Sequence, residues 1–244
     1  MRVFLTGDTH GFSEYKRIHR FRDIMRSDLS ADDILIVLGD FGFVWENKQK
    51  DLWMMERVWG DFPCRVFWID GNHENFDLLK EYPEGELYGG KIRHITDNIK
   101  YLQRGQVFEI QEQKIFTFGG AKSVDRGYGK STMWWWKEEL PNLYEMDEAI
   151  RNLKRYNNNV DYILTHECRY RILQKLFRYD KPNTVEFNAF LRWVDNNVVF
   201  KKWYFAHHHE DRGFEKYRCM FRDFLELGEE ENAVFLAPQN YPKN

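Results

Sequence analysis

RVFLTGDTHG, at residues 2–11, is the stretch that decides the fold: a short apolar run, a glycine, and then Asp8 and His10. An apolar run that ends in glycine and a polar side chain recurs as VLGD at 37–40 and as IDGN at 69–72. Helical periodicity fills the intervals between these runs, at 13–26 and 48–59. Such alternation predicts a parallel sheet built from βαβ units, with strands at 2–6, 33–38 and 65–69.

The rest of the chain mixes short strands with two further helices. We expect strands at 107–110, 114–118, 162–165 and 203–206, and two or three more between 214 and 235. Helical patterns cover 144–156 and 185–196, the second after a possible capping box that begins at Asn183. No Pro/Gly/Ser-rich linker or internal repeat interrupts the chain, so we expect one domain over residues 1–244.

Composition narrows the classes of partner. The net charge of -3 gives no global basic field, so we expect no extended nucleic-acid partner. The first residues lack a signal-peptide pattern, and no apolar stretch is long enough to span a membrane. The three cysteines are scattered and form no CxxC pair, which favours a reducing compartment. We therefore expect a cytoplasmic protein without a membrane partner; the oligomeric state is left open.

Polar clusters follow five of the expected strands. They contain Asp8 and His10, Asp40, Asn72 to Glu74, His166, and His207 to His209. Because ligands of open α/β sheets bind beyond the carboxyl ends of the strands, these clusters are expected to converge on one site. In extended chain, side chains two apart share a face, so Asp8 pairs with His10 and His207 with His209, while His208 is excluded.

Imidazole and carboxylate ligands suit zinc, iron, manganese and similar divalent cations. The order DxH, GD, GNH[DE], H and [GA]HxH, over positions 8 to 209, resembles that of the calcineurin-like metallophosphoesterases, especially small bacterial and phage members. The resemblance implies two divalent metals, Mn²⁺ first and Fe, Zn or Ni as alternatives. It also implies the ligands, with Asp8, His10 and His209 on the first metal, Asn72, His166 and His207 on the second, and Asp40 bridging both.

The same resemblance implies a mechanism and a fold. His73 would lie beside the phosphate as the catalytic residue, where it protonates the leaving alkoxide or binds a phosphoryl oxygen. The fold would be a four-layer α/β/β/α sandwich with two mixed β-sheets packed face to face. The sequence pattern agrees with this fold without requiring it.

Several residues near the motifs have two interpretations. Asp70 and Glu74 either orient a ligand imidazole or cap a turn. The segment 119–141 either forms a substrate loop, in which Arg126 grips phosphate oxygens, or a packed cap. Phe41 and Trp45, with Phe43 between them, are expected to form an aromatic edge near the metals that stacks a base. Arg169 and Arg171 either extend a positive rim or are solvated surface charges.

The central motif separates candidate substrates. Ser/Thr protein phosphatases continue GD as GDxxDRG, whereas this chain reads GDFGFVW at 39–45. We therefore expect a phosphodiesterase for nucleotide-like or small organic phosphoesters, ahead of a phosphomonoesterase or a protein phosphatase-like enzyme. A repair nuclease is disfavoured by the acidic pI. The alternative of another class is a non-catalytic scaffold on this fold, as in a retromer subunit that resembles these enzymes.

Overall fold

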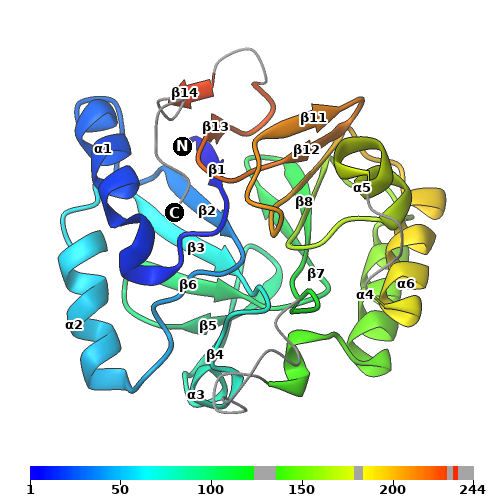
Figure 1. The fold of residues 1–244 in the computed structure, drawn as a ribbon, viewed down its shortest axis with the longest axis horizontal. Coiled ribbons are helices and arrows are strands. Elements are labelled where there is room, and N and C mark those ends of the chain that lie inside the picture. Colours follow the sequence, from blue (N-terminus) through cyan, green and yellow to red (C-terminus); the bar gives the residue numbers. More distant parts are fainter. Residues whose placement is uncertain (124–135, 179–183, 230–232, 236–244) are drawn as a thin grey trace.

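Two mixed sheets pack face to face and carry helices on their outer faces in the computed structural model (Figure 1). The structure describes residues 1–123, 136–178, 184–229 and 233–235, with no side-chain detail for the last range. From one outer face to the other the layers are helices, sheet, sheet and helices. The expected four-layer α/β/β/α sandwich is confirmed.

The first sheet has the strand order β14-β13-β1-β2-β3-β6-β5-β4. Its four central neighbours, β1, β2, β3 and β6, are mutually parallel, and the flanking pairs are antiparallel. All five residues of β2 (ILIVL) are buried, as expected of a parallel strand covered on both faces. The strand bounds are β1 Val3–Thr6, β2 Ile34–Leu38, β3 Arg65–Ile69, β4 Glu84–Leu87, β5 Gly90–His94, β6 Ile99–Leu102, β13 Phe224–Glu226 and β14 Ala233–Phe235.

The second sheet has the order β11-β12-β10-β9-β8-β7. Strands β12, β10, β9 and β8 are parallel neighbours, while β11 and β7 are antiparallel edges. The bounds are β7 Gln106–Ile110, β8 Gln113–Phe118, β9 Tyr162–Thr165, β10 Lys202–Phe205, β11 Arg212–Phe214 and β12 Tyr217–Cys219. In both sheets the parallel strands lie at the centre, and their carboxyl ends supply the polar clusters.

Helices α1 (Tyr15–Met25) and α2 (Lys48–Trp59) cover the outer face of the first sheet (Figure 1). Helices α4 (Leu143–Arg155), α5 (Tyr170–Phe177) and α6 (Val185–Asn197) cover the second. Three short helical segments lie near the polar loops: η1 Gly11–Glu14, α3 Phe76–Lys80 and η3 Lys137–Glu139. In the described ranges no helix combines the length and apolarity needed to cross a membrane.

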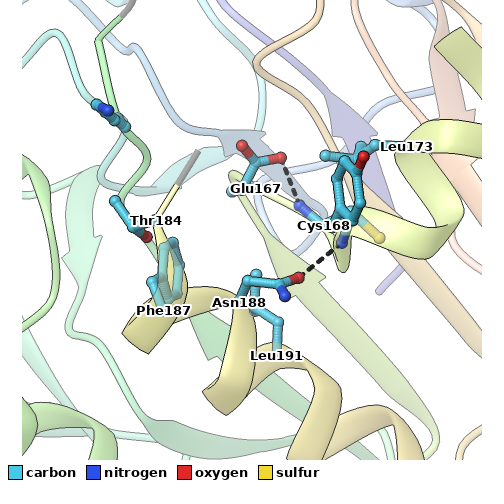
Figure 2. Close-up of a pocket in the computed structure, with 9 residues that line it drawn as sticks. Glu167, Cys168, Leu173, Thr184, Phe187, Asn188 and Leu191 are labelled. Atoms are coloured by element: carbon cyan, nitrogen blue, oxygen red, sulfur yellow. Dashed lines mark hydrogen bonds between the residues drawn. The ribbon is translucent and has the colours of Figure 1, made fainter. Parts of the chain in front are cut away.

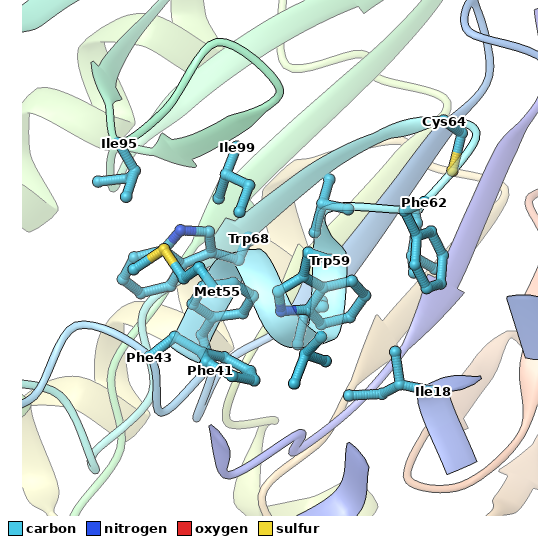
Figure 3. Close-up of a cluster of buried hydrophobic side chains, with 14 of the residues drawn as sticks. Ile18, Phe41, Phe43, Met55, Trp59, Phe62, Cys64, Trp68, Ile95 and Ile99 are labelled. Atoms are coloured by element: carbon cyan, nitrogen blue, oxygen red, sulfur yellow. The ribbon is translucent and has the colours of Figure 1, made fainter. Parts of the chain in front are cut away.

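Three apolar layers hold the four structural layers together. The layer between the sheets joins Leu5, Ile36 and Ile69 of the first sheet to Ile115 and Leu164 of the second. The layer under α1 and α2 is rich in large rings, which Figure 3 shows packed around Trp59 and Trp68. The high aromatic content of the sequence is therefore largely core.

The predicted elements agree with the structure at most positions. Helix α2 has the predicted bounds 48–59, whereas the helix predicted from 13 begins at Tyr15, because residues 11–14 form a 3₁₀ turn. Helices α3 and α5 were not predicted, since their five and eight residues are too few for a clear helical period. The capping box expected at Asn183 lies outside the described residues.

Candidate metal centre

All five polar clusters lie at the carboxyl ends of parallel strands. Asp8, Asp40 and Asn72 follow β1, β2 and β3, which are neighbours in the first sheet. His166 follows β9, and the histidines at 207–209 follow β10, its neighbour in the second sheet. Because the sheets pack face to face, loops from both meet at one end of the sandwich.

One group of side chains offers ligand atoms within 4.8 Å of one another: Asp8, His10, Asp40 and His209. The Nε2 atoms of His10 and His209 lie 3.0 Å apart. His209 Nε2 lies 3.8 Å from Asp8 Oδ1, and His10 Nε2 lies 3.7 Å from Asp40 Oδ2. The residues expected around the first metal are thus brought together from both sheets.

A second group lies on the other side of Asp40. His166 Nε2 is 3.2 Å from Asn72 Oδ1 and 3.5 Å from Asp40 Oδ1. The ring of His207 lies 5.0 Å, centre to centre, from that of His166. Asp40 therefore turns one carboxylate oxygen toward each group.

The tautomer of His166 suits a ligand. Its Nδ1 lies 2.7 Å from the carbonyl oxygen of Leu38, so the proton is on Nδ1 and is donated to that oxygen. The lone pair on Nε2 is then free to face Asn72 and Asp40. Backbone of one sheet thus orients a side chain of the other.

Two glycines permit this close approach. A Cβ atom at Gly39, where φ is +93°, would collide with the His166 ring, and one at Gly71 would collide with the Asp40 carboxylate. Only glycine lacks that atom and adopts such a φ without strain. The glycines of the GD and GN motifs are therefore needed for contact between the loops as well as for turns.

Burial and charge make the centre suitable for cations. Asp8 and Asp40 are buried, and burial together with the charge of Asp40 raises the pKa of Asp8 well above its usual value. Burial also raises the pKa of Asp40, but nearby imidazoles, His166 most of all, outweigh it and lower that pKa overall. Two adjacent buried carboxylates repel each other, and a bound divalent cation would compensate both.

Burial favours the neutral, ligating form of three histidines in this centre. Burial lowers the pKa of His10 to about 4 and that of His207 to about 3, and it also lowers the pKa of His209. Neutral imidazole is the form that binds metals. The 3.0 Å between the two Nε2 atoms of His10 and His209 matches the roughly 3 Å between neighbouring ligands of one ion bound at about 2.1 Å. The donor set therefore fits divalent metals.

His73 lies beside this centre without joining the close group. Its backbone N–H donates to Asp40 Oδ1 at 2.8 Å, and its ring centre is 5.8 Å from that of His10. The side chain is partly exposed. Its predicted role next to the phosphate stays a prediction.

The expectation that alternation in extended chain pairs the ligands was wrong. Asp8, His10, His207 and His209 all have positive φ, between 44° and 69°, so neither DxH nor HxH is extended. His208 instead turns toward Glu167, with Nε2 at 2.9 Å from Oε1. Tight left-handed turns, and not strand alternation, set the direction of these side chains.

Phe41 and Phe43 do not form the expected edge near the metals. Both are fully buried under α2, where Phe41 packs at 4.9 Å, centre to centre, on Trp68 (Figure 3). Only the backbone of Phe41 serves the site, because its carbonyl accepts from Thr9 Oγ1 and from the N–H of Gly11. The buried ring gains more from packing on the helix than a solvent-facing ring could.

Trp45 is half-buried and meets Trp136 edge to face, with ring centres 5.6 Å apart. The Trp136 indole N–H donates to Asp77 Oδ2 at 2.9 Å, and Asn75 donates to the Trp45 carbonyl at 2.8 Å. This indole pair is the aromatic surface that remains near the polar loops. Arg126, the other predicted substrate contact, lies outside the described residues.

Substitution of Phe41 distinguishes a role in the core from a role in substrate binding. We expect Phe41→Leu to lower the free energy of unfolding by about 1 kcal/mol and to leave KM within about twofold. Trp45→Leu, in the same loop, is the matched control and is expected to raise KM several-fold. Denaturant unfolding and steady-state kinetics measure both; a KM effect confined to Phe41→Leu would contradict this assignment.

Asp70 and Glu74 have structural partners. Asp70 accepts from Tyr101 Oη at 2.8 Å and from Arg104 Nε at 2.9 Å, all three groups being buried. Glu74 accepts from the N–H of Phe41 at 2.9 Å, and burial raises its pKa well above the usual value. Neither carboxylate contacts an imidazole among the described residues: Glu74 holds loop backbone, and Asp70 holds the side chains of Tyr101 and Arg104.

Three residues that sequence patterns did not indicate also shape the centre. Buried Arg17 donates to Thr6 Oγ1 at 2.6 Å and to the Gly7 carbonyl at 2.9 Å, which holds the turn that presents Asp8. Glu167 bonds His208 and lies 4.0 Å from His207 Nε2. Its position directly after His166 was the available signal. Ser123 accepts from Asn72 Nδ2 at 3.1 Å.

A hollow of about 260 Å³, partly open to solvent, lies behind Glu167 between α5 and α6 (Figure 2). Leu173, Phe187 and Leu191 form its apolar wall. The part of it that a water-sized molecule can enter is only about 10 Å³, so we assign no substrate to it. Of the two arginines considered for a positive rim, Arg169 pairs with Asp195, and Arg171 is exposed.

Solved structures provide distant comparisons. A candidate 5′-nucleotidase from Staphylococcus aureus shares 15% identity, with 95% of this chain and 51% of that chain covered and a TM-score of 0.44. The phosphopantetheinyl hydrolase of Mycobacterium tuberculosis shares 14% identity, with 90% and 88% covered and a TM-score of 0.42. GAP50, the anchor in the inner membrane complex of Plasmodium, shares 9% identity, with 91% and 71% covered and a TM-score of 0.49.

This chain thus spans about half the length of the first of these proteins. Likeness at these scores carries no argument about substrate, and no curated protein sequence gives a significant match. The family model for calcineurin-like phosphoesterases, in contrast, matches residues 1–211, which include every motif described above. The chain therefore belongs to the calcineurin-like phosphoesterase family.

Proposed function

We propose that this protein is a two-metal phosphodiesterase for nucleotide-like or small organic phosphoesters. The observation that carries the proposal is the position of Asp40, whose two oxygens lie 3.7 Å from His10 Nε2 and 3.5 Å from His166 Nε2. A buried carboxylate between two groups of neutral donors is suited to bridge two cations. The proposed ligands are Asp8, His10, Asp40, Asn72, His166, His207 and His209.

Two divalent metals at this centre would polarise the phosphoryl group and supply a nucleophile at neutral pH. The residues of the chain would provide the compensating charge, the metal ligands and the proton donor. Asp40 and Asp8 would supply the negative charge that compensates the cations, and His10 and His207, whose pKa is lowered by burial, would join the two ligand sets without adding charge. His73, fixed through its backbone N–H on Asp40, is placed to donate a proton to the leaving oxygen or a hydrogen bond to the phosphoryl group.

Substrate selection is proposed to involve Trp45 and its partner Trp136. An indole pair offers a flat apolar face for a base or another ring of the leaving group. Arg126 stays a proposed phosphate contact on the basis of the sequence alone. Among the metals, Mn²⁺ is our first choice for the cofactor, with Fe, Zn and Ni as alternatives. A phosphomonoesterase is the second candidate, and a scaffold the candidate of another class.

A substrate and metal panel tests the proposal. We expect purified, metal-stripped protein to hydrolyse bis(p-nitrophenyl) phosphate faster than p-nitrophenyl phosphate, with Mn²⁺ more effective than Ni²⁺, Zn²⁺ or Fe²⁺. Initial rates of p-nitrophenolate release provide the measurement, and excess chelator is the control that should abolish it. A strong monoester preference would identify a monoesterase, whereas no turnover with any metal would favour the scaffold.

A further inference from the structure

A chain of hydrogen bonds runs from Glu139 to the proposed ligand Asn72. Glu139 Oε2 accepts from Ser123 Oγ at 2.6 Å, and Ser123 Oγ accepts from Asn72 Nδ2 at 3.1 Å. Asn72 Oδ1 then faces His166 Nε2 at 3.2 Å. We propose that Ser123 and Glu139 are positioning residues that orient the Asn72 amide and set the affinity of the second metal position. This inference rests on the proposed two-metal function.

The direction of these hydrogen bonds follows from the chemistry of the groups. A carboxylate only accepts, so the Ser123 hydroxyl must donate its proton to Glu139. The hydroxyl then has only lone pairs left, and these can accept only from the NH₂ end of the Asn72 amide. The amide oxygen is thereby forced toward His166 and Asp40, where a metal would need it. Glu139 thus decides which end of the Asn72 amide would face a metal, although Glu139 itself does not touch that amide.

The geometry leaves little freedom to the three residues joined by these hydrogen bonds. Glu139 is fully buried, and Asn72 and Ser123 are 4% and 7% exposed. Ser123 contributes a second bond, because its backbone N–H donates to Glu139 Oε1 at 3.2 Å. Both carboxylate oxygens therefore hold the same residue, which fixes the hydroxyl in place.

Neighbouring contacts place Glu139 itself. Arg104, paired with Asp70, also donates to the carbonyl of Glu138 at 2.7 Å, which ties η3 to the first sheet. The N–H of Gly120 donates to the Asp70 carbonyl at 3.0 Å, which ties the residues after β8 to the same point. Asp70 begins the turn that carries Asn72. The hydrogen bonds of Ser123 and Glu139 and the contacts that hold Glu139 therefore surround this one turn.

The test measures Mn²⁺ binding to metal-free protein by calorimetric titration, without substrate. We expect Ser123→Ala to weaken the second Mn²⁺ by about 10–100-fold and to leave the first within about twofold, the range seen when a group that orients a ligand is removed. Glu139→Gln should act in the same direction, because its NH₂ group can reverse the hydrogen bonds. Ser123→Thr keeps the hydroxyl and should restore binding.

Two controls separate orientation from general damage. Glu138→Gln changes the adjacent residue of η3, which pairs with Lys80 and not with Ser123, and should bind both ions as wild type does. In an Asn72→Ala background, Ser123→Ala should produce no further change, because the amide it orients is absent. Thermal unfolding of each metal-free variant detects any loss of fold.

The outcomes distinguish this inference from the proposed function. A wild-type protein that binds fewer than two Mn²⁺ ions contradicts the two-metal proposal itself. If wild type binds two ions and Ser123→Ala binds them equally well, the positioning role is wrong. If Ser123→Ala weakens the binding of both Mn²⁺ ions in parallel, or has an equal effect with and without Asn72, the hydrogen bonds from Glu139 to Asn72 are merely structural and the inference is overturned.

Discussion

Asp40→Asn is expected to lower kcat/KM by about 10³-fold or more on any phosphoester that the wild type hydrolyses. Asp40 is the one side chain within 4 Å of ligand nitrogens in both groups of the described centre. Asparagine is isosteric, but it is neutral and its NH₂ end cannot bind a cation. Metal stabilisation of transition-state charge contributes several kcal/mol, and each ~1.4 kcal/mol corresponds to about tenfold in rate.

The variant should still fold, because the amide oxygen of asparagine can keep accepting from the N–H of His73. Asp33→Asn is the matched control: it changes another buried aspartate, next to the amino-terminal end of β2, where its partner is Arg2. Its kcat/KM should stay within about threefold of wild type. Steady-state kinetics and circular dichroism of both variants check the prediction, and an Asp40→Asn enzyme with near-normal kcat would refute a bridging role.

Arg104→Met is expected to lower the free energy of unfolding by about 3–5 kcal/mol. The substitution leaves Asp70 as a buried carboxylate without its cation, and removing one partner of a buried pair costs about that much. Nearby Asp70 and Glu145 raise the pKa of Arg104 against the effect of burial, consistent with a firmly charged guanidinium. Urea unfolding at neutral pH measures the change.

Arg151→Met serves as the control, because its pair with Asp147 is exposed on α4 and should contribute no more than about 0.5 kcal/mol. Asp70→Asn in the Arg104→Met background should recover part of the loss, since it removes the unpaired charge. If Arg104→Met proves as mild as Arg151→Met, Asp70 does not depend on this partner. That result would also weaken the support assigned to Glu139.

Motif spacing predicted which side chains gather, but not how they are held. The apolar runs before Asp8, Asp40 and Asn72 identify strands, and the carboxyl ends of parallel strands meet at one edge whatever their detailed geometry. The left-handed turns at His10 and His207 depend on contacts between distant loops, which a local alternation rule does not contain. The gathering of these side chains was therefore predictable, whereas the reason given for their orientation was wrong.

The remaining errors share one cause. Phe41 follows a metal motif in sequence, yet its ring is buried in the core with residues of α2. Ser123 and Glu139 act on Asn72 across separations of 51 and 67 positions, far beyond any periodic pattern. Residues whose role depends on tertiary contact need the fold before they can be recognised.

Because the side chains of the centre come from both sheets, they are synthesised at different times. On the proposed ligand set, Asp8, His10, Asp40 and Asn72 leave the ribosome early, while His166, His207 and His209 are supplied by β9 and β10 much later in the chain. A nascent chain that has folded only strands β1 to β6 of the first sheet carries both carboxylates but lacks the imidazoles of the second sheet. Catalytic competence would then arrive in a single late step, so unfinished or truncated chains would stay inert toward cellular phosphoesters.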